Sequence, residues 1–161
     1  YFRKLLKMKI DLLDKTKKNK IIEILEENYG ISKMPHLFLK SGDRIRIFSG
    51  NLSKEELNTL GKNLHVDLIG TKLGTIAEDN FRLSFDIMNL PIIKEQISKN
   101  IIEIDNDMTS KWLRGGNIDI IPNTENKFIS IKNNDDFLGI ARNHKSYLQN
   151  YIPKERKIKS K

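Results

Sequence analysis

The most informative segment of this sequence is KWLRGGNI, at residues 111–118. A helix is expected to end there on Gly115 and Gly116. Glycines accept a positive φ and let another backbone approach closely, so one interpretation is a nucleic-acid site with exposed amides flanked by Lys111 and Arg114. The alternative is an ordinary glycine cap with the preceding apolar side chains buried beneath it.

Extended segments and a short helix surround these glycines. The helix is expected to begin near Asn106 or Asp107, after a strand over residues 101–105. Three or four short strands are expected after the glycines, at Ile120, at residues 128–131 and 137–141, and at Ile152. This part of the chain is therefore predicted to be small and β-rich.

The N-terminal part is expected to combine a helix with a hairpin. Apolar residues at helical spacing predict a helix between Asp14 and Tyr29, and Gly30 is in position to end it. Residues 36–49 read as two extended segments around a turn, and residues 44–47 alternate Arg and Ile with period two.

A boundary is expected near Pro91. Before it, a capping-box pattern predicts a short helix over residues 53–60, and alternation predicts a second hairpin over residues 65–87. After it, a short polar helix should lead into the next strand. The sequence thus predicts two domains, residues 1–91 and residues 92–161.

The positive charge of the chain lies at its two ends. The 161 residues carry 29 Lys and Arg against 21 Asp and Glu, a net charge of +8. Residues 1–20 and residues 142–161 each carry a net +6, which leaves −4 for the residues between them. A polyanion such as nucleic acid should be drawn to the ends rather than to the body. Solvated basic tails without a ligand are the equally weighted alternative.

Several classes of chemistry are excluded or unsupported. The absence of cysteine excludes disulfides, thiolate zinc sites, iron–sulfur clusters and cysteine nucleophiles. His36, His65 and His144 are scattered, so we expect no metal site. No phosphate loop, dinucleotide fingerprint or nucleophile–base pair is found, so we expect no enzyme and no cofactor. Without a membrane-spanning run or a signal pattern, we expect a soluble cytoplasmic protein with no membrane partner.

Two motifs connect the C-terminal part to a known family. They are residues 113–118, a helix end with a glycine turn, and residues 128–141, paired strands with a Leu-Gly step. Residues 101–153 resemble a PUA domain, a pseudo-barrel RNA-binding module. Residues 69–90 resemble the pre-PUA half of Nip-type large-ribosomal-subunit biogenesis factors. The tail, residues 150–156, looks more like the end of the PUA-like domain attached to RNA 5-methylcytosine methyltransferases.

The resemblance implies an α+β protein, with an N-terminal α/β pre-PUA-like half and a C-terminal β-rich PUA pseudo-barrel. It implies a non-catalytic RNA-binding protein of ribosome biogenesis that binds rRNA or tRNA, with pre-ribosomal proteins or an RNA-modifying enzyme as further partners. The RNA-facing residues it implies are Lys111, Arg114, Gly115, Gly116, Arg142, Lys145, Lys154, Arg156 and Lys157. The alternatives are an RNA-binding domain of an rRNA or tRNA modification enzyme, and a protein-interaction scaffold that works through its acidic body.

Overall fold

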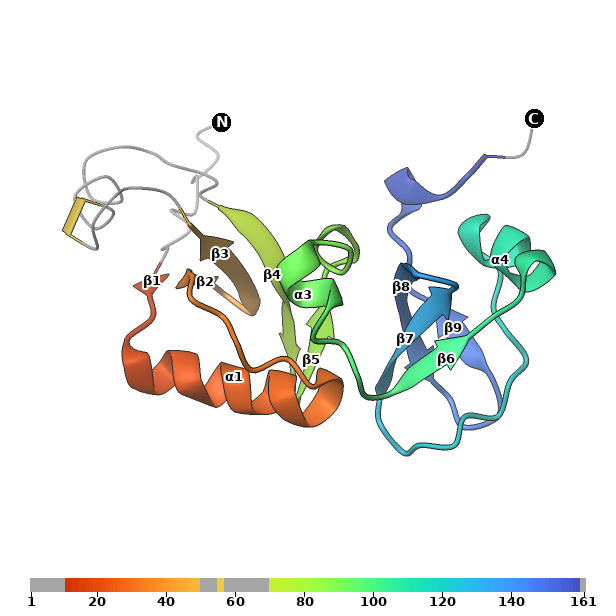
Figure 1. Ribbon diagram of the computed structural model, residues 1–161, viewed down its shortest axis with the longest axis horizontal. Coiled ribbons are helices and arrows are strands. Elements are labelled where there is room, and N and C mark those ends of the chain that lie inside the picture. The colour runs from red at the N-terminus through yellow and green to blue at the C-terminus, as the bar shows by residue number, and fades with distance from the viewer. Residues whose placement is uncertain (1–10, 50–54, 57–69, 160–161) are drawn as a thin grey trace, which may run out of the picture.

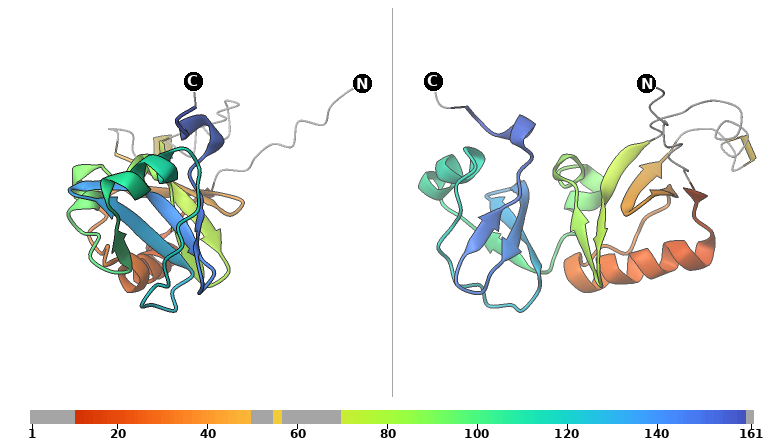
Figure 2. Two further views of the ribbon diagram at one scale, coloured as in Figure 1. Left: turned by 90° about the vertical axis from the view of Figure 1, so that its right-hand side faces the viewer. Right: turned by 180° about the vertical axis from the view of Figure 1, so that it is seen from behind.

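Two β-sheets with accompanying helices make up the structure, a computed structural model that describes residues 11–49, 55–56 and 70–159 (Figure 1). The first sheet has the strand order β1-β2-β3-β4-β5, and the second has the order β6-β7-β8-β9. The sheets lie side by side along the long axis of the molecule (Figure 2). The chain is an α+β protein. Among the described residues, no helix has the length and apolar character needed to cross a membrane.

The first sheet is antiparallel throughout. The hairpin expected over residues 36–49 is confirmed, with Gly42 in its turn at a φ of 60°. The helix expected over residues 53–60 lies outside the described residues, apart from positions 55 and 56. The strands of this sheet are β1 (Asp11–Leu12), β2 (Leu37–Ser41), β3 (Arg44–Phe48), β4 (Thr71–Ala77) and β5 (Asn80–Leu83).

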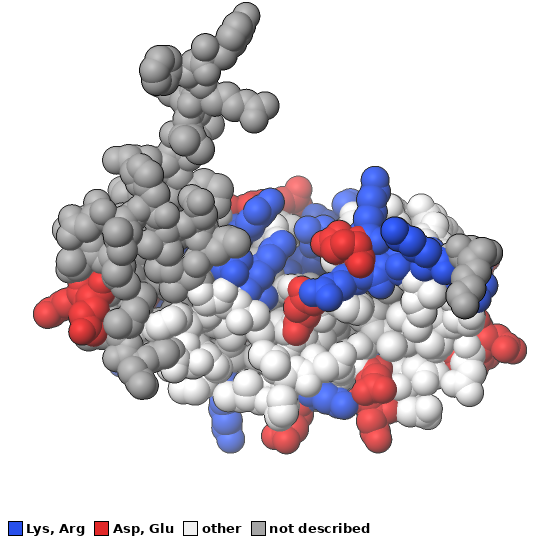
Figure 3. All heavy atoms as spheres, turned by 90° about the horizontal axis from the view of Figure 1, so that it is seen from above, with Lys and Arg blue, Asp and Glu red and all other residues white. Residues whose placement is uncertain are grey.

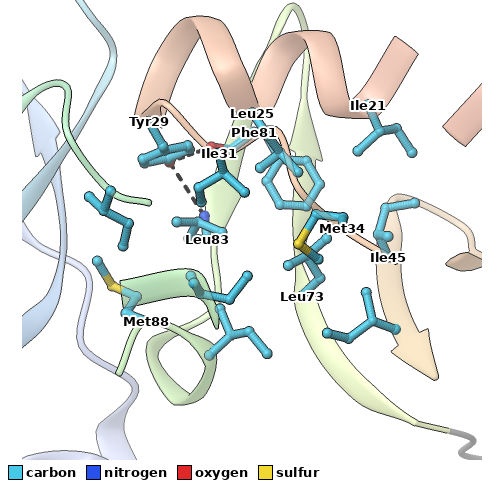
Figure 4. Packing of buried hydrophobic residues seen from close by; sticks show 14 of the residues in the cluster. Ile21, Leu25, Tyr29, Ile31, Met34, Ile45, Leu73, Phe81, Leu83 and Met88 are labelled. Atoms are coloured by element: carbon cyan, nitrogen blue, oxygen red, sulfur yellow. Dashed lines mark hydrogen bonds between the residues drawn. The ribbon is translucent and has the colours of Figure 1, made fainter. Parts of the chain in front are cut away.

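Helix α1 (Lys15–Tyr29) covers one face of this sheet, and the prediction of this helix is confirmed. Asp14 caps its first turn by accepting a hydrogen bond from the amide of Lys17 at 2.8 Å. Gly30 ends it in the left-handed conformation, with a φ of 84°. The apolar face of α1 packs on the side chains of β3, β4 and β5, which form the core of this half (Figure 4).

The second hairpin ends earlier than the sequence predicts, and the first residues predicted for it, 65–69, lie outside the described part of the chain. Strand β5 stops at Leu83, and Phe85–Ile87 form the 3-10 helix η1 instead of continuing the strand. The amide of Ser84 still reaches β4, at 2.8 Å from the Leu73 carbonyl, but the amide of Ile87 turns back to the Ser84 carbonyl at 3.2 Å. A short helix, α3 (Pro91–Lys94), follows.

The second sheet contains β6 (Ile101–Glu103), β7 (Phe128–Asn133), β8 (Asp136–Asn143) and β9 (Leu148–Asn150). Strand β6 pairs with β7 in parallel, and the other pairs are antiparallel. Helix α4 (Asn106–Leu113) and the 3-10 helix η2 (Lys154–Arg156) lie outside the sheet. The predicted strands at Ile120 and Ile152 are wrong: an isolated bridge forms at Ile118 instead, and Ile152 is buried without strand pairing.

The two sheets share a hydrophobic core. Phe128, Phe137 and Ile140 of the second sheet belong to the same buried cluster as the side chains beneath α1. The Asn89 side chain also donates to the Phe137 carbonyl at 2.8 Å and accepts from its amide at 3.0 Å. A second cluster, around Trp112, lies between α4 and the other face of the second sheet.

Candidate nucleic-acid interface

Helix α4 is held firmly at both ends of its short length. Asp105 caps its first turn and accepts a hydrogen bond from the Met108 amide at 2.8 Å. Trp112, at its last turn, is completely buried, and its indole nitrogen donates to the Leu138 carbonyl at 2.7 Å. The glycines that follow α4 therefore have a fixed position over the second sheet.

The amides of the two glycines already have acceptors within the protein. The Gly115 amide donates to the Trp112 carbonyl at 2.9 Å, and the Gly116 amide donates to the Lys111 carbonyl at 3.0 Å. Gly115 has a φ of 99°, as a helix-ending glycine requires. The two amides are therefore engaged within the protein, and Gly115 forms the glycine cap over a buried Trp112 that the alternative interpretation expects.

The glycines instead leave room for two lysine side chains. A Cβ atom on Gly115 would lie 2.9 Å from Cδ of Lys157, and one on Gly116 would lie 2.6 Å from Cγ of Lys111. The amide of Ile158 donates to the Leu113 carbonyl at 2.9 Å, which holds the C-terminal segment beside α4. Two basic segments far apart in the sequence thus meet at this turn. We call Lys111, Arg114 and Lys157 the turn cluster.

The Asn150 side chain of strand β9 holds the glycine turn through hydrogen bonds. The Asn150 side-chain nitrogen donates to the Trp112 carbonyl at 2.7 Å and to the Gly116 carbonyl at 3.1 Å. Its oxygen accepts from the Ile152 amide at 2.9 Å. Asn150 therefore uses its whole amide group to join β9, the glycine turn and the start of the C-terminal segment.

The other expected residues divide into separate groups. Lys154 and Arg156 belong to η2, where Arg156 pairs with Asp86 of η1 at 2.8 Å. Lys145 lies in the β8–β9 turn with a φ of 68°. Arg142 follows Ala141, which packs in the cluster beneath α4, so the alternation of β8 directs Arg142 to the opposite face.

Both tyrosines of the basic C-terminal stretch pack against protein. Tyr147 stacks on His144, with ring centroids 4.7 Å apart and an interplanar angle of 8°. Tyr151 packs against Phe128, at 6.3 Å between centroids, and its hydroxyl accepts a hydrogen bond from Arg142 at 3.4 Å. Both rings therefore have aromatic neighbours within the protein.

The outer face of the first sheet carries arginines that the sequence analysis did not select. Ile45 and Ile47 of β3 are buried in the core beneath α1. Since successive side chains of a strand point to opposite faces, Arg44 and Arg46 lie on the face away from that core. The period-two alternation of residues 44–47 contains this signal, whereas a net charge summed along the chain does not distinguish the two faces of a strand.

Two more cations share this outer face. Lys72 of β4 is the direct cross-strand partner of Arg46. Arg82 of β5 lies between the buried residues Phe81 and Leu83, so its side chain points away from the core. We call the four residues the sheet-face cluster: Arg44, Arg46, Lys72 and Arg82.

The pKa of Lys72 reflects the concentration of positive charge on this face. Burial lowers the pKa of Lys72, and the neighbouring charges of Arg44 and Arg82 lower it further. The hydrogen bond with the Tyr151 hydroxyl raises the pKa of Arg142. Seen from above, Lys and Arg gather in a band that runs from the first sheet toward the C-terminal end, with fewer Asp and Glu among them (Figure 3).

The histidines supply no obvious chemistry to this surface. Burial, with a smaller effect of Lys18, lowers the pKa of His36. His144 is hydrogen bonded to Gln149 at 2.7 Å, and His65 lies outside the described residues. Within the part of the chain that the structure describes, no three His, Asp or Glu side chains are grouped to hold a metal ion.

Comparison with known proteins identifies no relative: no family model matches the chain, and no curated protein matches it. Functional inference therefore depends on the geometry and charge of the described residues, together with the resemblance of residues 69–90 and 101–156 to the families named above.

Proposed function

We propose that the protein is a non-catalytic RNA-binding factor that acts in ribosome biogenesis, in rRNA processing or assembly. In this proposal residues 92–161 are a PUA-type RNA-binding half and residues 1–91 are its pre-PUA-like companion. The observation that supports the proposal is the meeting of the α4 turn with the basic C-terminal segment, made by the Ile158–Leu113 hydrogen bond.

The chemistry of the turn favours a phosphate partner bound by side chains. The carbonyl end of a helix carries a partial negative charge, so α4 itself would repel a phosphate. The ammonium groups of Lys111 and Lys157, which lie across the glycines, reverse the sign of the charge at this end. Affinity would then come from Lys and Arg contacts with the RNA backbone, and it should fall steeply with salt.

The test is a salt series of binding to an rRNA fragment and to a tRNA. We compare the intact protein with a turn variant, Lys111→Gln, Arg114→Gln and Lys157→Gln. The slope of log affinity against log salt should fall by up to about 2.7, since each phosphate contact contributes about 0.9 on a duplex. A preference for the rRNA fragment supports biogenesis, whereas a preference for tRNA favours the domain of a modification enzyme.

The matched control removes the same charge elsewhere. The α1 variant, Lys15→Gln, Lys17→Gln and Lys20→Gln, changes three exposed cations of the helix on the other face of the first sheet. It should keep the slope of the intact protein. No RNA binding by the intact protein at low salt would overturn the proposal and favour a protein-interaction scaffold. An equal effect of the two variants would show that only net charge matters.

A further inference from the structure

The outer face of the first sheet presents its cations in two cross-strand rows. Arg46 of β3 is directly opposite Lys72 of β4. Thr75 of β4 is opposite Arg44 on one side and Arg82 on the other, so this row crosses three strands. Neighbouring strands are about 4.8 Å apart, so the four side chains share a small area of the sheet. The Arg46 guanidinium also donates to the Gly70 carbonyl there.

An irregularity in the strand pairing produces one of these contacts. The register between β3 and β4 shifts between Ile45, which is opposite Gly74, and Arg46, which is opposite Lys72. The extra residue, Leu73, is completely buried in the core. The bulge therefore keeps the apolar Leu73 inside and sets Lys72 beside Arg46 on the outer face. Bulges that redirect a side chain in this way are typical of functional surfaces.

The four neighbouring cations of the sheet-face cluster are unfavourable for the stability of the sheet. Like charges directly across a strand pair are unfavourable. Burial lowers the pKa of Lys72, the charges of Arg44, Arg82 and Arg46 lower it further, and the carboxylate of Asp43 raises it. Departures from favourable local arrangement are expected at functional sites. A bound anion would turn the repulsion within the sheet-face cluster into attraction.

The sheet-face cluster continues into the second half of the molecule. The Arg82 guanidinium lies 5.2 Å from the centre of the Tyr151 ring, and Arg142 donates to the hydroxyl of the same tyrosine. Arg142, which sequence analysis grouped with the α4 turn, thus lies beside the first sheet's cations. The band of positive charge in Figure 3 extends over both halves.

We propose that the sheet-face cluster is a second RNA-contacting surface, so that one RNA contacts the first sheet and the turn cluster together. This inference rests on the proposed function. Tyr147 and Tyr151 have aromatic neighbours within the protein, whereas the two surfaces offer positive charge to the RNA backbone. The partner is a folded, double-stranded RNA recognised by its backbone and shape.

The experiment uses RNA hairpins with stems from 8 to 30 base pairs, which bracket the roughly 16 base pairs that a small double-stranded-RNA domain covers. The sheet-face variant is Arg44→Gln, Arg46→Gln and Lys72→Gln, and the α1 variant is again the matched control. With long stems, the salt slope of the sheet-face variant should fall by up to about 2.7. With the shortest stems the fall should be smaller, because such an RNA can bind at the turn cluster alone.

Two further variants distinguish a loss of RNA contacts from a loss of folding. Arg44→Lys with Arg46→Lys keeps the charge and should keep the slope, since Lys binds phosphate as a point charge. Arg44 is exposed, so Arg44→Gln alone should fold and should lower the slope by about 0.9. A thermal unfolding curve for each variant shows that the comparison is between folded proteins.

The outcomes separate the two proposals. If the intact protein binds none of the hairpins, the proposed function fails and the inference fails with it. If the turn variant loses salt slope while the sheet-face variant behaves like the α1 variant, only the inference fails. Two RNA molecules per protein, or single-stranded RNA bound as tightly as the hairpins, would also contradict it.

Discussion

The hydroxyl of Tyr29 joins α1 to β5 at the centre of the first core. It donates to the Phe81 carbonyl and accepts from the Leu83 amide at 3.4 Å, and the residue is completely buried (Figure 4). In Tyr29→Phe, a buried carbonyl and a buried amide lose this partner. We expect the free energy of unfolding, measured by urea titration, to fall by about 1–3 kcal/mol.

Tyr29 also makes the stability of the protein depend on pH in the alkaline range. Burial raises the pKa of Tyr29 well above its usual value of 10.0. The unfolded chain therefore loses this proton first, and stability falls as pH rises through the unfolded pKa. Tyr29→Phe lacks this effect, so the stability difference between the two proteins should narrow between about pH 9 and pH 11. A constant difference across this interval would contradict the assignment.

At the scale of the element, the end of α4 depends on one side chain of β9. Asn150→Asp removes the two donations to the Trp112 and Gly116 carbonyls and sets a carboxylate beside the negative end of the helix. We expect the free energy of unfolding to fall by about 2–3 kcal/mol. RNA affinity should fall as well, because Lys111 and Lys157 lose the fixed turn across which they lie.

Urea titration and RNA binding measure these two effects. The control is Asn134→Asp, which adds the same charge in the exposed turn between β7 and β8. It should change the free energy of unfolding by less than about 0.5 kcal/mol. Equal losses of RNA affinity in both variants would mean that the added charge, and not the position of the turn, is responsible.

Patterns among neighbouring residues in the sequence are sufficient to predict some elements of the fold. The cap at Asp14, the glycine at Gly30 and the 3.6-residue periodicity between them are sufficient for α1, and the β2–β3 hairpin follows from its turn and alternation. Ile120 and Ile152 show the limit of this approach. Ile152 is buried and Ile120 is half-buried although neither is in a strand. Only tertiary pairing decides whether such a residue joins a strand.

The candidate site was only partly accessible to the same reasoning. The helix end at Gly115 could be predicted from the sequence. The hydrogen bonds of the Gly115 and Gly116 amides to the Trp112 and Lys111 carbonyls could not. Lys157 reaches Gly115 through a contact that no local pattern encodes. The sheet-face arginines were missed for a different reason: a net charge of −4 summed over the body does not record which face of a strand each charge occupies.

At the scale of the whole molecule, the two sheets are joined through β7 and β8. Phe128 belongs to the cluster beneath α1, whereas its neighbour Ile129 belongs to the cluster around Trp112. Asn89 adds two hydrogen bonds from the segment before α3 to the backbone of Phe137. Removing either half would expose apolar side chains of the other, so we expect the halves to unfold together.

Leu25→Ala in α1 tests this coupling. Leu25 is completely buried, and its truncation should lower the free energy of unfolding by about 2–5 kcal/mol. Trp112 is the single tryptophan and lies in the other cluster, so its fluorescence reports on the second half. The fluorescence and far-UV circular dichroism transitions in urea should coincide in both proteins and shift together. If the urea midpoint of the Trp112 fluorescence does not change in Leu25→Ala while the circular dichroism transition becomes biphasic, the halves unfold independently. An RNA that spans both halves would then bind two separately stable units.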